Sequence, residues 1–241
     1  MKKIIDLLTY LLIFNILISL SLLLGTYYNK NNISQTSLEI YISNNDNYNL
    51  IEQILKDTNN EDLIKFIDYI ELDVNHHIKN DTNNYTSFTI TLPQDKSFIA
   101  LYKKTTNDTY IFHSIVDNLN TIDNFYFYNQ FFIVEQSIKL PSNIENNKKF
   151  IEIFLTKEKK CLSVLKKDIY KEINDVNKDY LKIIESSSID FLNSNPTQVV
   201  YVSTCKYFYN NIDTSDTVIT KEIYEWKSTL NEFKIKSREI L

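Results

Sequence analysis

The stretch Phe125–Val134, FYFYNQFFIV, decides the fold because it is the most aromatic run in the chain. Phe and Tyr alternate over its first four residues, and a period of two is typical of a β-strand with one face in the core. We therefore expect a strand with its Phe side chains inside and Tyr126 and Tyr128 at the surface. The alternative is a Tyr face that stacks on a sugar or a peptide, which makes Tyr126 and Tyr128 candidate binding residues.

The same period of two recurs on both sides of this run. Apolar residues alternate with Ser and Thr up to Leu92, and two apolar runs flank Asn107 and Asp108 in the pattern of a hairpin. Together with Phe150–Leu155, these segments predict an antiparallel sheet of about five strands over residues 85–156. Further strands are expected at 199–209 and 218–226.

Helix signals lie near both ends of the chain. A capping residue stands three positions before a Glu at Asn49 and again at Thr58, which predicts two short N-terminal helices at about 50–57 and 60–72. Apolar residues spaced three or four positions apart predict a final amphipathic helix from about residue 228.

The segment from Leu162 to Ile184 carries the longest helical pattern. Its apolar residues recur every three or four positions with polar residues between them, which predicts one long amphipathic helix. The alternative is two strands, 161–173 and 180–189, with a turn at Asn174–Asn177. We favour the helix, so the expected fold class is α+β, an antiparallel sheet with two short N-terminal helices and one long amphipathic helix.

A single N-terminal transmembrane helix is expected in front of this fold. Leu7–Tyr28 has 22 residues without Asp, Glu, Lys or Arg, and about 20 apolar residues cross a bilayer. Lys2 and Lys3 precede the segment, which favours a cytoplasmic N-terminus and places the rest outside the cytosol. The predicted domains are a transmembrane signal-anchor at 1–28, a polar tether at 29–48 and an extracytoplasmic α+β domain at 49–241.

Two consequences for location follow from this segment. As an anchor, residues 7–28 make the lipid bilayer a partner of the chain and define a single-pass membrane protein. As a cleaved secretory signal, they would instead release a secreted protein. The anchor is favoured because the apolar run is long and lacks a small-x-small cleavage site.

The composition is strongly biased and excludes several classes of site. The chain has 29 Asn but one Ala, one Arg and one Gly, a bias typical of a low-GC genome. Because the only Gly is Gly25, phosphate-cradling loops, dinucleotide fingerprints and Gly-x-Ser-x-Gly elbows are excluded. A net charge of −5 without a basic stripe disfavours nucleic acid as a partner.

The scarcity of Gly also predicts which residues make turns. A turn with positive φ after Gly25 must be built by Asn or Asp, the residues that tolerate this conformation best. The expected turn sites are Asn45–Asp46, Asn80–Asp81, Asn107–Asp108, Asn146–Asn147 and Asn210–Asn211.

Few side chains suggest chemistry. Asp73, His76 and His77 have spacings of three and four that could share a helix face, and they are the candidate metal ligands or acid/base pair. The alternative is a polar helix end that faces solvent. His113, within an apolar strand, is expected to be half-buried and hydrogen-bonded.

The two cysteines, Cys161 and Cys205, have two possible fates. They could form a disulfide in an oxidising compartment or remain as two buried thiols, and the sequence leaves both open.

The function favoured by these observations is a non-enzymatic one. We expect no catalytic residue and no cofactor, and a membrane-anchored extracytoplasmic protein with a binding or assembly role and a protein partner at the cell envelope. The first alternative is an exported metal-assisted hydrolase that uses Asp73, His76 and His77. The second is a secreted effector or adhesin, released after signal cleavage.

Overall fold

The computed structural model describes residues 41–42, 46–80, 83–105, 109–138, 145–174, 180–209 and 215–241. The chain forms two compact units. The first contains residues 1–64 and 104–111, and the second contains residues 65–103 and 112–241.

Helix α2, Asn47–Asp57, belongs to the first unit and largely confirms the helix predicted at 50–57. Its N-cap is Asp46, whose side chain accepts a hydrogen bond from the Asn49 backbone N–H at 3.3 Å. Its apolar residues at helical spacing are buried; they are Leu50, Ile51, Ile54 and Leu55. The second predicted helix, 60–72, is a shorter 3₁₀ helix, η1, at Glu61–Tyr69, because a strand already begins at Glu71.

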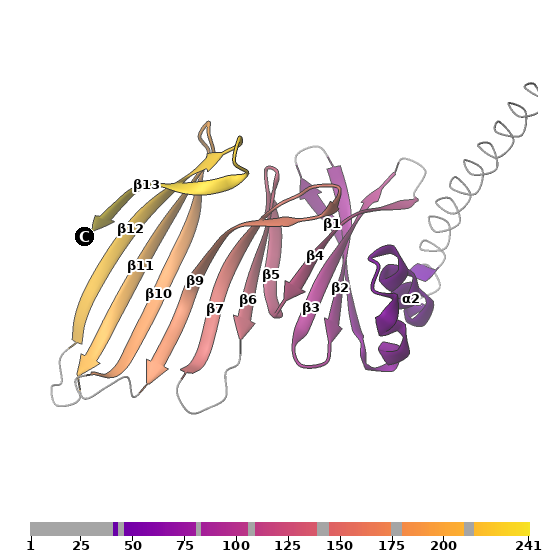
Figure 1. Ribbon diagram of the computed structural model, residues 1–241, viewed down its shortest axis with the longest axis horizontal. Helices are drawn as coiled ribbons and strands as arrows, with labels where there is room; N and C mark the ends of the chain where they lie inside the picture. Colours follow the sequence, from indigo (N-terminus) through magenta and orange to yellow (C-terminus); the bar gives the residue numbers. More distant parts are fainter. Residues whose placement is uncertain are drawn as a thin grey trace, which may run out of the picture. The chain divides into compact units, whose positions relative to one another are not determined.

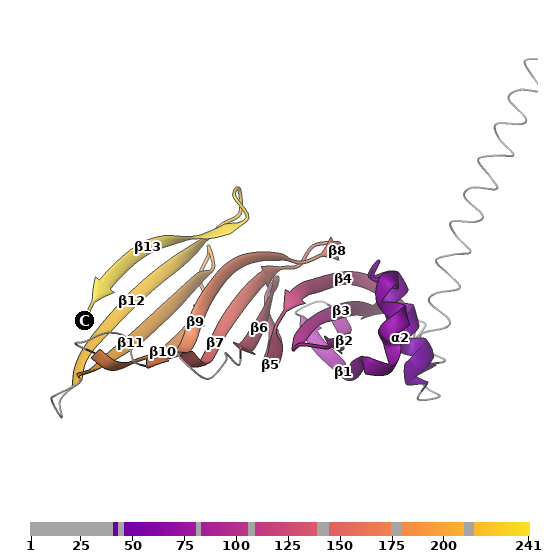
Figure 2. The same cartoon turned by 60° about the horizontal axis from the view of Figure 1, so that its bottom comes forward.

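Most of the rest of the described chain is β-structure (Figure 1). The strands are β1 (Glu71–Asn80), β2 (Asn83–Leu92), β3 (Lys96–Lys104), β4 (Tyr110–Leu119), β5 (Thr121–Tyr128), β6 (Phe131–Ile138), β7 (Glu145–Leu155), β8 (Lys159–Lys160), β9 (Leu162–Asn174), β10 (Tyr180–Leu192), β11 (Gln198–Tyr209), β12 (Ser215–Lys227) and β13 (Glu232–Ile240). The described strands form a small sheet in the order β1-β2-β3-β4-β8 and a large sheet in the order β13-β12-β11-β10-β9-β7-β6-β5. Figure 2 shows the large sheet tilted, with β13 and β5 at its two ends.

Strand β6 is the centre of the second unit because both of its faces are buried. Phe131 and Ile133 belong to a cluster with Trp226 and Phe233 on one face of the large sheet, which we call the inner face. The next residues along the strand, Phe132 and Val134, point to the opposite face. There they pack in a second cluster with small-sheet residues, including Ile99, Leu101 and Val116. The aromatic run Phe125–Val134 is thus a hairpin of two strands that contributes to both cores.

The predicted α+β fold class is wrong, and the long helix is the main error. Residues 162–174 form β9 and residues 180–184 form the first part of β10, as in the two-strand alternative. Opposite β7, the register of β9 skips Val164 and again Ile169. Each extra residue shifts the alternation by one, so strand spacings of two become spacings of three that imitate a helix.

The predicted C-terminal helix is also wrong. The chain turns at Lys227–Asn231 and returns as β13, which pairs with β12. Here too the register shifts once, at Ile223 and Tyr224. The five strands predicted over residues 85–156 are also distributed over two sheets rather than one.

The described residues also correct the predicted membrane location. Where the structure describes the chain, no helix is long and apolar enough to cross a bilayer; α2 and η1 have 11 and 9 residues, against the roughly 20 that a span needs. The segment Leu7–Tyr28, which supported the prediction, lies outside the described residues. We therefore withdraw the transmembrane helix and the single-pass location with a cytoplasmic N-terminus.

Asn and Asp do supply most of the positive-φ positions in the described chain. These are Asn59, Asp95, Asn118, Asn129 and Asn231, beside Gln94 and Lys159. The individual turn sites were predicted less well, because Asn146 and Asn147 lie within β7, Asn80 within β1, and Asp46 caps α2. The remaining predicted turn residues, Asn45, Asp81, Asn107, Asp108, Asn210 and Asn211, lie outside the described residues.

Candidate functional site

A polar cavity of about 600 Å³ lies on the inner face of the large sheet and is lined by residues of β9 to β13. The strand register explains why this part of the face is hollow. Ser203 of β11 is paired with Ser187 of β10 and with Thr220 of β12, and Thr220 is paired with Ile240 of β13. Directly paired residues share a face, so three small side chains stand next to one another. We call Ser187, Ser203 and Thr220 the small row.

Larger side chains border the small row on both sides. The row on the side of the aromatic cluster contains Tyr201, Glu222 and Arg238 in register. The row on the other side contains Glu185, Cys205 and Val218. The cavity is thus bounded by aromatic and charged side chains on one side and by Glu185 with the shorter Cys205 and Val218 on the other.

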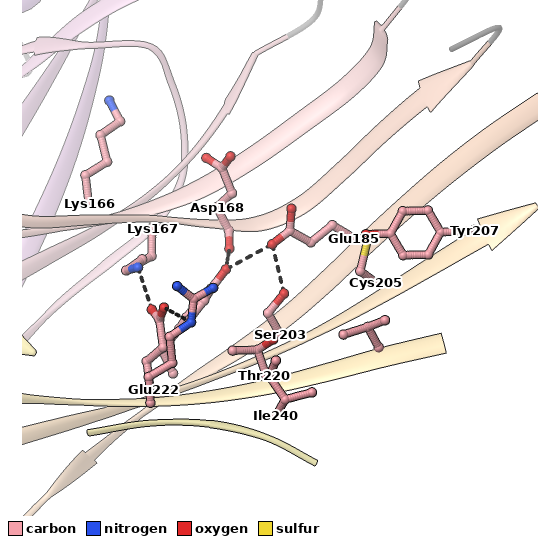
Figure 3. Close-up of a pocket in the computed structure, with 13 residues that line it drawn as sticks. Lys166, Lys167, Asp168, Glu185, Ser203, Cys205, Tyr207, Thr220, Glu222 and Ile240 are labelled. Atoms are coloured by element: carbon pink, nitrogen blue, oxygen red, sulfur yellow. Dashed lines mark hydrogen bonds and ion pairs between the residues drawn. The ribbon is translucent and has the colours of Figure 1, made fainter. Parts of the chain in front are cut away.

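Glu222 is the centre of an ionic network at one end of the cavity (Figure 3). Although only 7% exposed, its carboxylate lies 2.8 Å from Lys167 Nζ and accepts a hydrogen bond from the Tyr224 hydroxyl. Arg238 Nε lies 3.4 Å from the other carboxylate oxygen. The Lys167 ammonium also lies over the rings of Tyr201 and Tyr224, at 4.8 and 4.7 Å from their centroids. The network is therefore held from four strands.

This network fixes the charges of its members. Burial alone would raise the pKa of Glu222, but the hydrogen bonds from Lys167 and Tyr224 outweigh it, and the pKa lies below its ordinary value of 4.5. Burial likewise favours the neutral amine of Lys167, yet the bonds to Glu222 and Tyr224 raise its pKa above 10.5. At neutral pH both groups stay ionised, so Glu222 is a poor general base and Lys167 a poor nucleophile.

Tyr201 and Glu185 form a second polar group beside the small row. The Tyr201 hydroxyl donates to the backbone carbonyl of Asp168 at 2.8 Å, beyond the residues where β9 and β10 pair. Glu185 Oε1 accepts a hydrogen bond from Ser203 Oγ at 2.8 Å and lies 3.4 Å from the Tyr201 hydroxyl oxygen. Among the described residues no ion pair to Glu185 is formed. Burial raises the pKa of Tyr201, which therefore stays a neutral donor.

Lys166 does not contribute its charge to the cavity. Figure 3 shows its side chain pointing away from Lys167 and Glu222. Its Nζ lies 3.3 Å from Glu152 and 3.9 Å from the Phe150 ring centroid.

The predicted binding residues Tyr126 and Tyr128 lie on β5 and are partly buried against the inner-face cluster. The Tyr128 ring stacks on Phe191 with centroids 4.4 Å apart. Burial, with a smaller effect of Glu135, raises the pKa of Tyr126. Their role as a stacking platform stays a prediction.

Asp73, His76 and His77 lie on β1, where a strand rise of about 3.3 Å per residue removes the helical neighbourhood their spacing suggested. The His76 and His77 side chains are outside the described ones. Elsewhere, the described His, Cys, Asp and Glu residues form no group of three or more that could hold a metal ion. The metal site stays a prediction.

Asp73 itself lines a second cavity of about 360 Å³ with Asn75, Thr89 and Phe125. The other acidic residue at this cavity, Asp123, accepts a hydrogen bond from Ser137 and forms an ion pair with Lys149 at 3.1 Å. One carboxylate is therefore already neutralised, and we do not assign a cation to this cavity.

His113 is half-buried in β4, as predicted, and its ring lies 5.2 Å from that of Tyr85. Burial, assisted by Lys103, lowers its pKa. Cys161 and Cys205 are both free thiols. Cys161 is buried beside Ser114, and burial raises its pKa to about 11, whereas Cys205 lines the 600 Å³ cavity.

None of the residues of this cavity was singled out as a site from the sequence. Lys167, Glu185, Glu222 and Arg238 come from four strands and meet only through the register of the large sheet. The single available signal was Arg238, the one Arg in a chain that otherwise uses Lys for its positive side chains.

No protein-family model, curated protein or solved structure matches this chain.

Proposed function

We propose that this chain is a non-enzymatic binding protein that holds a small polar ligand in the cavity of the inner face. The observation that carries the proposal is the small row, which hollows a sheet whose neighbouring rows bear charged and hydrogen-bonding side chains. A concave site with a few convergent polar groups is the usual form of a small-molecule site.

The electrostatics favour binding over catalysis. Glu222 and Lys167 stabilise each other's charged form, and neither is poised to exchange a proton near neutral pH. Because Glu222 is held by Lys167 and Tyr224, the network is rigid before a ligand arrives, which lowers the entropic cost of binding.

Assembly through the edge of the large sheet is less well supported. The edge strand β13 carries Glu232, Lys234, Lys236, Arg238 and Glu239 among its nine residues. Charged side chains on an edge strand oppose pairing with another strand.

The experiment compares a substitution that fills the cavity with a matched substitution on the opposite face of the same strand. Full-length chain is screened by thermal shift against single amino acids, short peptides, dicarboxylates and monosaccharides, and hits are measured by titration calorimetry. Ser203→Leu should abolish binding of any hit, while Thr204→Leu, one residue along β11 and on the opposite face, should not. The proposal fails when no compound binds, or when Ser203→Leu binds as well as Thr204→Leu.

A further inference from the structure

The arrangement of charge around the small row indicates what kind of ligand the cavity takes. We propose that the ligand is a small zwitterion of the amino-acid or short-peptide class, with its carboxylate at Arg238 and its ammonium group at Glu185. This inference rests on the proposed function and adds the chemistry of the ligand.

Arg238 is suited to receive a carboxylate. Its side chain is 65% exposed, and the ion pair with Glu222 engages Nε at 3.4 Å. The terminal guanidinium nitrogens form a planar fork that binds carboxylates through two parallel hydrogen bonds. Lys167 is unsuited to this role because it is half-buried and committed to Glu222.

The identity of residue 238 supports this role. Of the 26 Lys and Arg residues in the chain, Arg238 alone is Arg. A Lys at this place would supply the charge but not the fork. The one guanidinium of the chain stands at the rim of the 600 Å³ cavity.

Glu185 is suited to receive an ammonium group. The hydrogen bond from Ser203 and the 3.4 Å contact with the Tyr201 hydroxyl both involve Oε1, and Figure 3 draws Oε2 on the side away from these two groups. A half-buried carboxylate without a cation gains from a positive ligand group. An ammonium group of the ligand would complete the pairing that the described residues leave open.

The two charges are separated by a distance that suits such a ligand. Glu185 lies on β10 and Arg238 on β13, three strand spacings apart across the sheet (roughly 14 Å), and their rows lie four residues apart along the strands (roughly 13 Å), so their backbones are roughly 19 Å apart. The Glu185 carboxylate reaches the small row, where it accepts a hydrogen bond from Ser203, and the long Arg238 side chain covers part of the remaining distance. The gap between the two charged groups then suits a ligand of about one or two peptide residues at roughly 3.5 Å each. Val218 and Ile240, 37% and 76% exposed, provide apolar walls for a ligand side chain.

The test uses ligands in which one charge at a time is removed. The probes are the amino acid leucine, the dipeptide Ala-Leu, its N-acetyl form and its C-terminal amide, titrated into full-length chain by calorimetry. Leucine or Ala-Leu should bind, and each blocked form should bind roughly 10- to 100-fold more weakly, because each loses one charged hydrogen-bonding partner.

Two conservative variants assign each end of the ligand. Glu185→Gln keeps the shape and should bind Ala-Leu and N-acetyl-Ala-Leu equally, while still preferring the free carboxylate to the amide. Arg238→Gln should bind Ala-Leu and its C-terminal amide equally, while still preferring the free ammonium group to the N-acetyl form. Lys236→Gln, on the same strand and paired with Glu225 at 3.2 Å, should behave as the unsubstituted chain.

The outcomes separate this inference from the proposed function. Equal binding of free and blocked peptides overturns the zwitterion. The zwitterion is also overturned if a sugar or a dicarboxylate binds most tightly and Ser203→Leu abolishes its binding. In that case the proposed binding function still stands. If Ser203→Leu abolishes the binding of none of the probes, the zwitterion inference and the proposed binding function both fail. Because the blocked ligands require no substitution, misfolding of a variant cannot decide the result.

Discussion

Glu222 is the residue on which the inner face depends. It is a buried carboxylate whose cost of desolvation is offset by Lys167, Tyr224 and Arg238. Buried ion pairs add little net stability compared with apolar residues, but losing one partner is costly because the other charge stays buried. The network therefore defines the geometry of the site more than it stabilises the sheet.

Lys167→Met should lower the free energy of unfolding by about 3 kcal/mol, since it leaves Glu222 buried without its ammonium partner. Urea denaturation followed by Trp226 fluorescence measures the change. The matched control is Lys166→Met, whose amine is half exposed at 50% and should cost less than about 1 kcal/mol. Equal losses for the two variants would show that the Lys167 pair has no special role.

The stability that Glu222 contributes should also depend on pH. Because its pKa is lower in the folded chain than its ordinary value of 4.5, the contribution is present above that value and is lost as the pH falls through the folded pKa. The pKa of Lys167 is raised, so its contribution is complete throughout the acidic range. The difference in unfolding free energy between the unsubstituted chain and Glu222→Gln should be constant from pH 6 to 8 and shrink below pH 4.5. A difference that grows on acidification contradicts this assignment.

At the scale of the element, the edge strand β13 is protected by charge rather than by a covering element among the described residues. Lys234 and Lys236 flank Ile235, which is 57% exposed. Their charges keep a strand with open backbone hydrogen-bonding groups from pairing with other chains.

Lys234→Val combined with Lys236→Val should produce self-association, because it creates the apolar run Phe-Val-Ile-Val on the open edge. Light scattering after size exclusion at several protein concentrations should show larger species for the double variant than for the unsubstituted chain. Lys206→Val, on the internal strand β11, removes an exposed Lys away from any edge and should not associate. Association of Lys206→Val to the same extent would point to lost solubility instead.

Elements with simple alternation were predictable from the sequence, whereas those with bulges were not. The strands at 199–209 and 218–226 were predicted because local pattern and long-range pairing agree there, as in β11 and β12. In β9 the extra residues Val164 and Ile169 produce a helix-like spacing, and only pairing with β7 shows it to be a strand. Local propensity did contain a warning, since the Asn and Asp cluster after residue 173 is typical of a turn.

The cavity could not be predicted for a different reason. Ser203, Thr220 and Glu185 are ordinary residues in their local sequence and become neighbours only through a register that pairs β10, β11 and β12. A shift of that register by one residue would turn each of these side chains to the other face. The site is therefore a property of the pairing rather than of a motif.

At the scale of the whole second unit, the two apolar clusters are joined by β6. The ring centroids of Phe131 and Trp226 lie 4.9 Å apart in the inner-face cluster, and those of Phe132 and Phe127 lie 4.9 Å apart in the other cluster. A strand that is required by both clusters couples them, so we expect this unit to unfold in one transition.

Phe132→Ala should lower the free energy of unfolding by about 3 to 5 kcal/mol, the usual cost of removing a fully buried Phe. Trp226, the single Trp, reports on the inner-face cluster although Phe132 points away from it. Its fluorescence midpoint in urea should therefore fall together with that of far-ultraviolet circular dichroism. Phe66→Ala, which removes a Phe that is 45% exposed, is the control. An unchanged Trp226 midpoint in Phe132→Ala would mean that the clusters unfold independently.

The hollow on the inner face has a consequence for how its selectivity can change. The hollow lies over the short side chains of Ser203 and Thr220, and the strands pair in regular register at these residues. Substituting these residues by others of different length or polarity would change the shape and polarity of the cavity, while the paired strands keep their arrangement. New specificities are thus within reach of one or two point changes, for natural selection and for a protein engineer alike.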